Sequence, residues 1–85
     1  MAATWQIVLD RQPFDFYRSL RSVDRRALDR AFAELEANPF RQGDLQRRDL
    51  IGRTIEIGVF GKFLLHSWDD YPAKELRIVR IERMN

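Results

Sequence analysis

The beginning of the chain changes from a two-residue to a helical spacing of apolar residues. Residues 4–9 have apolar side chains at every second position, with Val8 on the opposite side, and contain β-branched residues, so they predict a short strand. The apolar side of this strand consists of Trp5, Ile7 and Leu9. Pro13 suits the first turn of a helix, where its missing N–H costs nothing. Apolar residues then recur every third position, which predicts a helix over residues 13–20.

A second, longer helix is expected to begin at Ser22 and to end at Asn38. Ser22 is a suitable N-cap, and Asp24 lies where the helix dipole favours an acid. Pro39 ends the helix because the residue before a proline avoids the α region. The apolar stripe of this helix consists of Leu28, Ala31, Phe32 and Leu35. Since so few residues separate the two helices, we expect them to pack as a hairpin.

The second half of the chain has the pattern of a sheet. Residues 40–53 are a polar and basic connection. Residues 54–59 alternate apolar with polar or small side chains, and residues 62–68 are mostly apolar, so both predict strands. Turn-forming residues at 69–73 predict a loop before a last strand over residues 74–82. The order predicts an α+β fold with an N-terminal strand, a helical hairpin and a three-stranded antiparallel sheet.

The alternation also predicts which side chains of the sheet are buried. Both helices should cover one sheet face, and the apolar side of residues 54–59 should meet them there. That side consists of Ile55, Ile57 and Val59. On the last strand, Leu76 and Ile78 would occupy one face, and Val79 and Ile81 the other. A strand that is apolar on both faces is usually central in its sheet.

Composition narrows the class of protein. The 85 residues suffice for a single domain, residues 1–85, and the absence of cysteine excludes disulfides and thiolate metal sites. No apolar run reaches the length of a membrane span, and residues 1–5 lack the basic flank of a signal peptide, so a cytoplasmic protein is expected. The net charge of +2 favours contact with nucleic acid or with an acidic partner.

No phosphate loop, dinucleotide fingerprint, serine elbow or metal-ligand spacing is present. The remaining candidates for a catalytic site are side chains of the predicted sheet. If the helices cover one face, the free face could gather Glu56, Lys62, His66, Arg77 and Arg83. Such a group could cleave RNA at its 2′-hydroxyl. A carboxylate or imidazole would remove the proton, and cations would stabilise the phosphorane.

Further basic residues could bind the RNA backbone. These are Arg47, Arg48, Arg53 and Arg80, together with Lys62. Structural interpretations compete with each of these assignments. A single histidine in an apolar strand is often a hydrogen-bonded core residue, and alternating Arg and Glu on the last strand often form solvated ion pairs. The arginines near Asp49 could simply pair with it.

Several segments together resemble the RelE/ParE superfamily of toxins, along nearly the whole chain. They are the first strand at residues 5–9, the helix end Leu-Glu-Ala-Asn-Pro-Phe at residues 35–40, and residues 53–59, 63–70 and 74–82. The resemblance implies a toxin that a cognate antitoxin protein holds inactive. RelE-like members cleave messenger RNA on the ribosome without a metal or other cofactor, and ParE-like members act on DNA gyrase.

The sequence departs from the RNA-cleaving members at several positions. Glu56, Gly58 and Phe63 stand where those members typically carry arginines on the second and third strands. His66 stands where they carry a tyrosine, and the basic or tyrosine-containing end is reduced to Arg83. Two hypotheses follow. One is a ribosome-dependent endoribonuclease. The other is a binding module without chemistry, either a gyrase inhibitor or a degenerate toxin that only binds its antitoxin.

Overall fold

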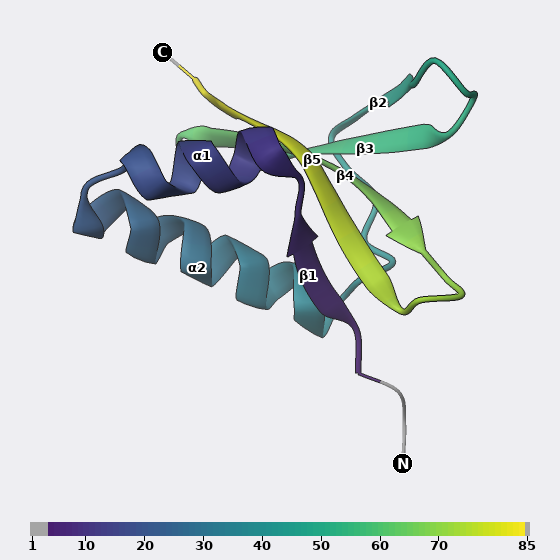
Figure 1. Ribbon diagram of the computed structural model, residues 1–85, viewed down its shortest axis with the longest axis horizontal. Helices are drawn as coiled ribbons and strands as arrows, with labels where there is room; N and C mark the ends of the chain where they lie inside the picture. Colours follow the sequence, from purple (N-terminus) through teal and green to yellow (C-terminus); the bar gives the residue numbers. More distant parts are fainter. Residues whose placement is uncertain (1–3, 85) are drawn as a thin grey trace.

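The computed structural model describes residues 4–84, and its elements follow the predicted order with one addition (Figure 1). Strand β1 (Gln6–Leu9) leads into helices α1 (Arg11–Ser19) and α2 (Ser22–Ala37). Four strands follow. These are β2 (Leu45–Arg48), β3 (Thr54–Phe60), β4 (Phe63–Asp70) and β5 (Glu75–Arg83). The α+β class and the helical hairpin are confirmed. The expectation of no signal peptide concerns residues 1–5, of which 1–3 lie outside the described residues.

The strands form one five-stranded sheet in the order β1-β5-β4-β3-β2. Strand β5 is an interior strand and not an edge, as predicted, and it pairs in parallel with β1 and antiparallel with β4. The additional strand β2 arises within the segment that was expected to be a connection. All four of its residues are exposed and two are arginines, so no apolar alternation marked it. Such a short, charged strand is typical of a sheet edge.

Both helices pack on one face of the sheet, and the core lies between the helices and this face (Figure 1). Leu28 and Leu35 of α2 are buried as predicted, and Phe32 packs against the core while partly buried. The core cluster consists of Leu28, Ala31, Leu35, Phe63, Leu65, Leu76, Ile78 and Ile81. Ser22 is the first helical residue, so the N-cap position falls one residue earlier, on Arg21.

The apolar side of β3 faces away from the helices, which corrects one prediction. The pairing of Gly58 with core residue Leu65 directs Gly58 and its even-numbered neighbours towards the helices. Ile55 is nevertheless buried, but Ile57 is only partly buried and Val59 is 41% exposed. The alternation was correctly recognised, but the sequence did not indicate which face the helices cover.

The two faces of β5 also differ from the prediction. His66 of β4 pairs with Arg80, and Ser67 pairs with Ile78, so Val79 has no partner and forms a β-bulge. The extra residue reverses the alternation. Leu76, Ile78 and Ile81 therefore all enter the core cluster. The sequence had placed Ile81 on the opposite face because it assumed an uninterrupted two-residue period.

Asp24 connects the beginning of α2 to the far end of the sheet. Lys62 Nζ lies 2.7 Å from its Oδ1, and Arg83 donates a hydrogen bond of 3.0 Å to its Oδ2. The hydrogen bond from Lys62, followed by that from Arg83, holds the pKa of Asp24 below its usual range in spite of burial. This cluster joins α2 to the turn before β4 and to the end of β5.

Replacement of the central core side chain tests the packing. Leu28→Ala should lower the free energy of unfolding by about 2–5 kcal/mol, because it leaves a cavity between α2 and the sheet. Val23→Ala is the matched control, since Val23 lies on the same helix and is 63% exposed, and it should change stability by less than about 0.5 kcal/mol. Urea unfolding followed by circular dichroism measures both. Equal effects would contradict the core assignment.

The ion cluster predicts a pH-dependent difference in stability. Because folding lowers the pKa of Asp24, its contribution is fully present above the unfolded value of about 3.9 and is lost as pH falls through the lower folded value. Asp24→Asn should therefore be less stable than wild type at pH 7, and the gap should close between about pH 5 and pH 2. Asp15→Asn, in an exposed pair with Arg11, is the control. A gap that is constant with pH would exclude this role.

Candidate functional site

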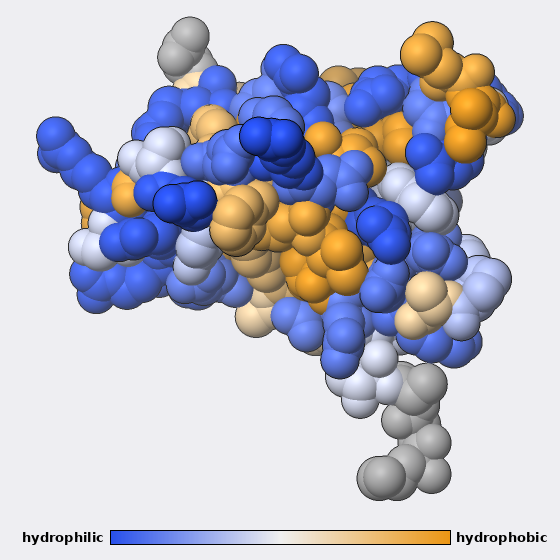
Figure 2. Space-filling model, viewed as in Figure 1, coloured by the Kyte–Doolittle hydropathy of each residue, from blue (hydrophilic) through white to orange (hydrophobic). Residues whose placement is uncertain are grey.

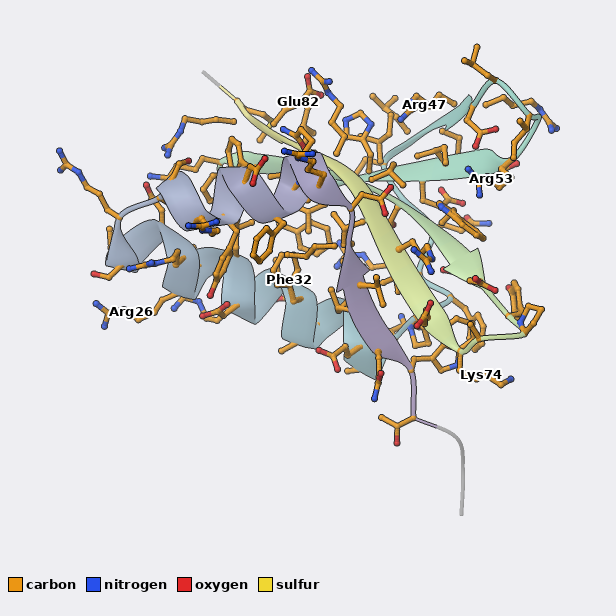
Figure 3. The ribbon with its side chains drawn as sticks, viewed as in Figure 1. Arg26, Phe32, Arg47, Arg53, Lys74 and Glu82 are labelled. Carbon is orange, nitrogen blue, oxygen red and sulfur yellow. The ribbon has the colours of Figure 1, made fainter. Side chains whose placement is uncertain are left out.

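A hydrogen-bonded network on the sheet face opposite the helices is the candidate site. Its centre is His66 of β4, which pairs with Ile57 of β3 on one side and with Arg80 of β5 on the other. Arg47 reaches it from β2 and Glu82 from β5, and both lie on the same side of the sheet in Figure 3. Four strands thus meet at one imidazole.

The contacts of His66 define the position of its proton. Arg47 Nε donates a hydrogen bond of 3.3 Å to Nδ1 of the ring. A guanidinium group can only donate, so Nδ1 carries a lone pair and the single proton of the neutral ring lies on Nε2. Nε2 then donates to Oε2 of Glu82 at 2.8 Å. The network fixes one tautomer and one ring orientation.

Glu82 is held as an anion. Its pKa lies below the usual range, first because of the hydrogen bond from His66 and then because Arg80 donates to Oε1 at 3.1 Å, although partial burial acts in the opposite direction. An oriented carboxylate on one ring nitrogen stabilises the imidazolium that would form when the other nitrogen takes up a proton. Glu82 was not among the residues expected from the sequence, and no spacing marked it.

The site combines one potential base with two cations. Arg47 and Arg80 contribute two positive charges and Glu82 one negative charge, so the group has a net charge of +1 when the ring is neutral. The His66 residue is only 6% exposed, because neighbouring side chains cover it. If Arg47 transferred its hydrogen bond to a phosphate oxygen, Nδ1 would become free to accept a proton. The geometry thus links anion binding to activation of the base.

Arg77 lies on the same face but in acidic surroundings. Its guanidinium is 3.1 Å from Glu75, 3.8 Å from Asp10 and 3.9 Å from Asp70. Three carboxylates offset its charge, which disfavours a phosphate contact. Arg83 lies beyond the β-bulge and points to the helix side, where it contacts Asp24. The expectation that Arg77 and Arg83 share one strand face is therefore wrong.

Lys62 and Glu56 also belong to the helix side, so they do not gather around His66 as expected. Lys62 is bound to Asp24 at the turn before β4. Glu56 accepts hydrogen bonds from the backbone N–H of Gly43 at 3.0 Å and from Gln46 at 2.7 Å. Its register with buried Ser67 explains this orientation. Glu56 therefore positions the segment before β2.

Two further predicted arginines lie on the hairpin formed by β2 and β3. Arg53 pairs with Asp49 at 2.7 Å, as the structural interpretation proposed, and its guanidinium lies 4.1 Å from the ring centroid of Trp68. Arg48 donates a hydrogen bond of 2.9 Å to the carbonyl of Gly52. Of the nine residues singled out from the sequence, Arg47, His66 and Arg80 meet in one hydrogen-bonded group through Glu82. Lys62 and Arg83 meet in a separate group around Asp24, on the helix side.

No group of three potential ligands within residues 4–84 is arranged to hold a metal ion. Neither helix of this part of the chain is long and apolar enough to cross a membrane. On the helix side, a depression of about 280 Å³ lies between α2 and the turn that joins β3 to β4. Its lining includes Ala27, Ala31 and Phe63 together with the charged Arg30 and Glu34.

Comparison with known proteins gives one informative likeness. No protein-family model and no curated protein matches the sequence. Among solved structures, a chain of the archaeal RelE–RelB complex from Pyrococcus horikoshii OT3 superposes with a TM-score of 0.72. The alignment covers 95% of this chain and 96% of that one, at 13% sequence identity. The chain therefore has the RelE-like α+β fold that its sequence predicted.

Proposed function

We propose that this protein is the toxin of a toxin–antitoxin pair and that it cleaves ribosome-bound messenger RNA in the cytoplasm, without a metal or small-molecule cofactor. The fold is that of a RelE–RelB structure along nearly the whole chain. The single observation that carries the activity is the network in which Glu82 orients His66 between Arg47 and Arg80. It combines a base with phosphate-binding cations.

In the proposed reaction, a phosphate of the message binds between Arg47 and Arg80. Arg47 then releases Nδ1 of His66, which removes the proton from the adjacent 2′-hydroxyl. The 2′-oxygen forms a bond to phosphorus, and the bond from phosphorus to the 5′-oxygen breaks. The leaving oxygen takes a proton from water, and the hydroxide so formed takes the proton from His66, which restores the neutral ring. The products are a 2′,3′-cyclic phosphate and a 5′-hydroxyl. Glu82 stabilises the imidazolium, and the arginines stabilise the phosphorane.

The remaining predicted residues take other roles in this proposal. Arg48 and Arg53 contact Gly52 and Asp49 at the end of the hairpin, where they would contact the RNA backbone. Arg77, Arg83, Lys62 and Glu56 hold structure through ion pairs and hydrogen bonds. We therefore place catalysis on His66 alone among the five residues that the sequence had suggested for the free sheet face.

The proposed partner is a cognate antitoxin. The depression beside α2 has apolar walls and charged rims of both signs, which suits an amphipathic segment that folds on binding. This partner follows from the proposed class and from the complex in which the matched chain was solved. Co-expression with a neighbouring antitoxin-like reading frame, followed by affinity purification, should recover both proteins. Recovery of the toxin alone from cells that express both would oppose it.

A binding function without chemistry, such as inhibition of DNA gyrase, is the second candidate. It is favoured by the covering of His66, which is hydrogen-bonded at both ring nitrogens and only 6% exposed. The two candidates differ in what happens to the message. Only the first predicts new RNA ends, and only the second predicts loss of gyrase supercoiling by the purified protein.

Single-turnover cleavage of ribosome-bound message tests the catalytic assignment. His66→Ala should lose on the order of 10²–10⁴-fold in rate while remaining folded, because it removes the general base. Glu82→Gln should lose less, because glutamine still accepts the hydrogen bond but does not stabilise the imidazolium. Arg77→Ala should cut like wild type, in contrast to the site expected from the sequence.

Circular dichroism is the folding control for all three variants, and Arg11→Ala is a matched change at an exposed arginine on the helix side. If His66→Ala cuts at the wild-type rate, the proposed base is wrong. If wild type leaves the message intact and inhibits gyrase supercoiling, the second function replaces the first.

Chemical modification tests the covering role of Arg47. The chain has one histidine, so diethyl pyrocarbonate reports on a single imidazole. Wild type should react much more slowly than free histidine, because the hydrogen bonds from Arg47 and to Glu82 occupy both ring nitrogens. Arg47→Ala should react faster. Arg48→Ala is the matched control and should leave the rate unchanged. Rapid modification of wild type would show that the ring is already accessible.

A further inference from the structure

The turn between β2 and β3 presents two aliphatic side chains to solvent. Leu50 is fully exposed and Ile51 is 75% exposed. Figure 2 shows a hydrophobic patch at the far end of this hairpin, separated from the apolar surface at the centre of the molecule. These side chains contribute no burial to the core. Apolar groups gathered at a projecting tip are typical of a binding surface.

The tip has a fixed shape because Asp49 holds it. Oδ1 of Asp49 accepts hydrogen bonds from the backbone N–H groups of Ile51 at 3.0 Å and Arg53 at 2.8 Å. Arg53 Nε donates to Oδ2 at 2.7 Å, and this contact is the main reason why the pKa of Asp49 is lowered. Gly52 supplies the positive φ of 86° that the turn requires. Leu50 and Ile51 are thus presented on a preorganised turn.

The charge of the hairpin indicates the class of partner. Residues 45–53 contain three arginines and one aspartate, so they carry +2, which equals the net charge of the whole chain. Two exposed side chains are far too few for a protein interface, which buries about 800 Å² on each partner. They do match a single step between stacked bases, since leucine and isoleucine act as wedges between the base steps of duplex DNA in proteins that also carry arginine contacts.

We propose that Leu50 and Ile51 form a wedge that inserts between neighbouring bases of single-stranded RNA, while Arg48 contacts the adjacent backbone. The choice of RNA rests on the proposed function. Leu50 lies three residues after Arg47, in the turn beyond the end of β2, so the two are at most about 10 Å apart at full strand rise. This distance spans about three stacked nucleotides at 3.4 Å each.

The position of the wedge gives it a role in cleavage. Stacking holds an RNA strand in a helical form in which the 2′-oxygen is not in line with the bond that must break. Separation of one base step near the phosphate at Arg47 and His66 releases the strand from that form. The hairpin would thereby prepare the message for attack by the 2′-oxygen.

Fluorescence of a short RNA that contains 2-aminopurine tests the wedge, because this base brightens when it is unstacked. Binding to wild-type protein should raise the fluorescence several-fold. The double variant Leu50→Ser/Ile51→Ser should lose most of this rise and keep its fold, since both side chains are exposed. Val23→Ser is the matched control, because it also replaces an exposed aliphatic residue, on the helix side.

Binding of the same RNA, measured by filter retention, separates the wedge from the backbone contacts. The double variant should bind within about tenfold of wild type. Arg48→Ala should reduce the slope of log affinity against log salt by about 0.7, as expected for one lost phosphate contact on a single strand. Equal fluorescence with wild type and the double variant would overturn the proposal. Binding of the RNA by wild type without any brightening would overturn it as well.

His66→Ala distinguishes this proposal from the proposed cleavage. That variant should brighten the RNA as wild type does, because the wedge needs no base catalyst. If wild type brightens the RNA and cuts no message, the wedge stands and the nuclease fails. If the double variant loses association with a co-expressed antitoxin and still brightens the RNA, the tip is a protein contact and the wedge is wrong.

Discussion

The β-bulge at Val79 determines how both faces of this sheet are used. Side chains of a strand alternate between its faces, and one extra residue reverses the alternation from that point on. Before the bulge, Leu76 and Ile78 face the helices, and after it Ile81 does. Without the extra residue, Ile81 would face solvent and Glu82 would enter the core, where an unpaired carboxylate is strongly unfavourable. The bulge therefore preserves the core and delivers Glu82 to His66.

The same reversal places on opposite faces of the sheet two arginines that the sequence pattern had assigned to one face. Arg77 precedes the bulge and lies among acidic side chains on the sheet face opposite the helices. Arg83 follows the bulge and binds Asp24 of α2 on the helix side. Arg80, adjacent to the bulge, is directed to the carboxylate that orients His66. The three arginines of β5 thus have three different environments. The positive charge of an arginine does not by itself predict which of the three faces a ligand.

The candidate site and the hairpin tip are built in opposite ways. His66 is almost fully covered, and an arginine of an exposed edge strand hydrogen-bonds its Nδ1. Leu50 and Ile51 are uncovered, and a carboxylate holds their backbone in one shape. Arg47, which hydrogen-bonds Nδ1, belongs to β2, and Leu50 and Ile51 lie in the turn after it. Strand β2 has no buried residue and pairs with β3 at the edge of the sheet, so it can change its contacts at little cost to the fold.

Local patterns in the sequence were sufficient for the order of the elements other than β2, the helical hairpin, the interior position of β5 and the burial of Leu28 and Leu35, because helix and strand periods reflect burial within one element. Strand β2 left no such signal, since none of its residues is buried. His66 and Arg80 could be named as candidates from their chemistry, but Glu82 could not. Which residues meet depends on strand register and on a bulge, and both are decided by pairing between segments distant in the chain. Only the folded sheet could therefore show that Arg47, His66 and Glu82 form one network.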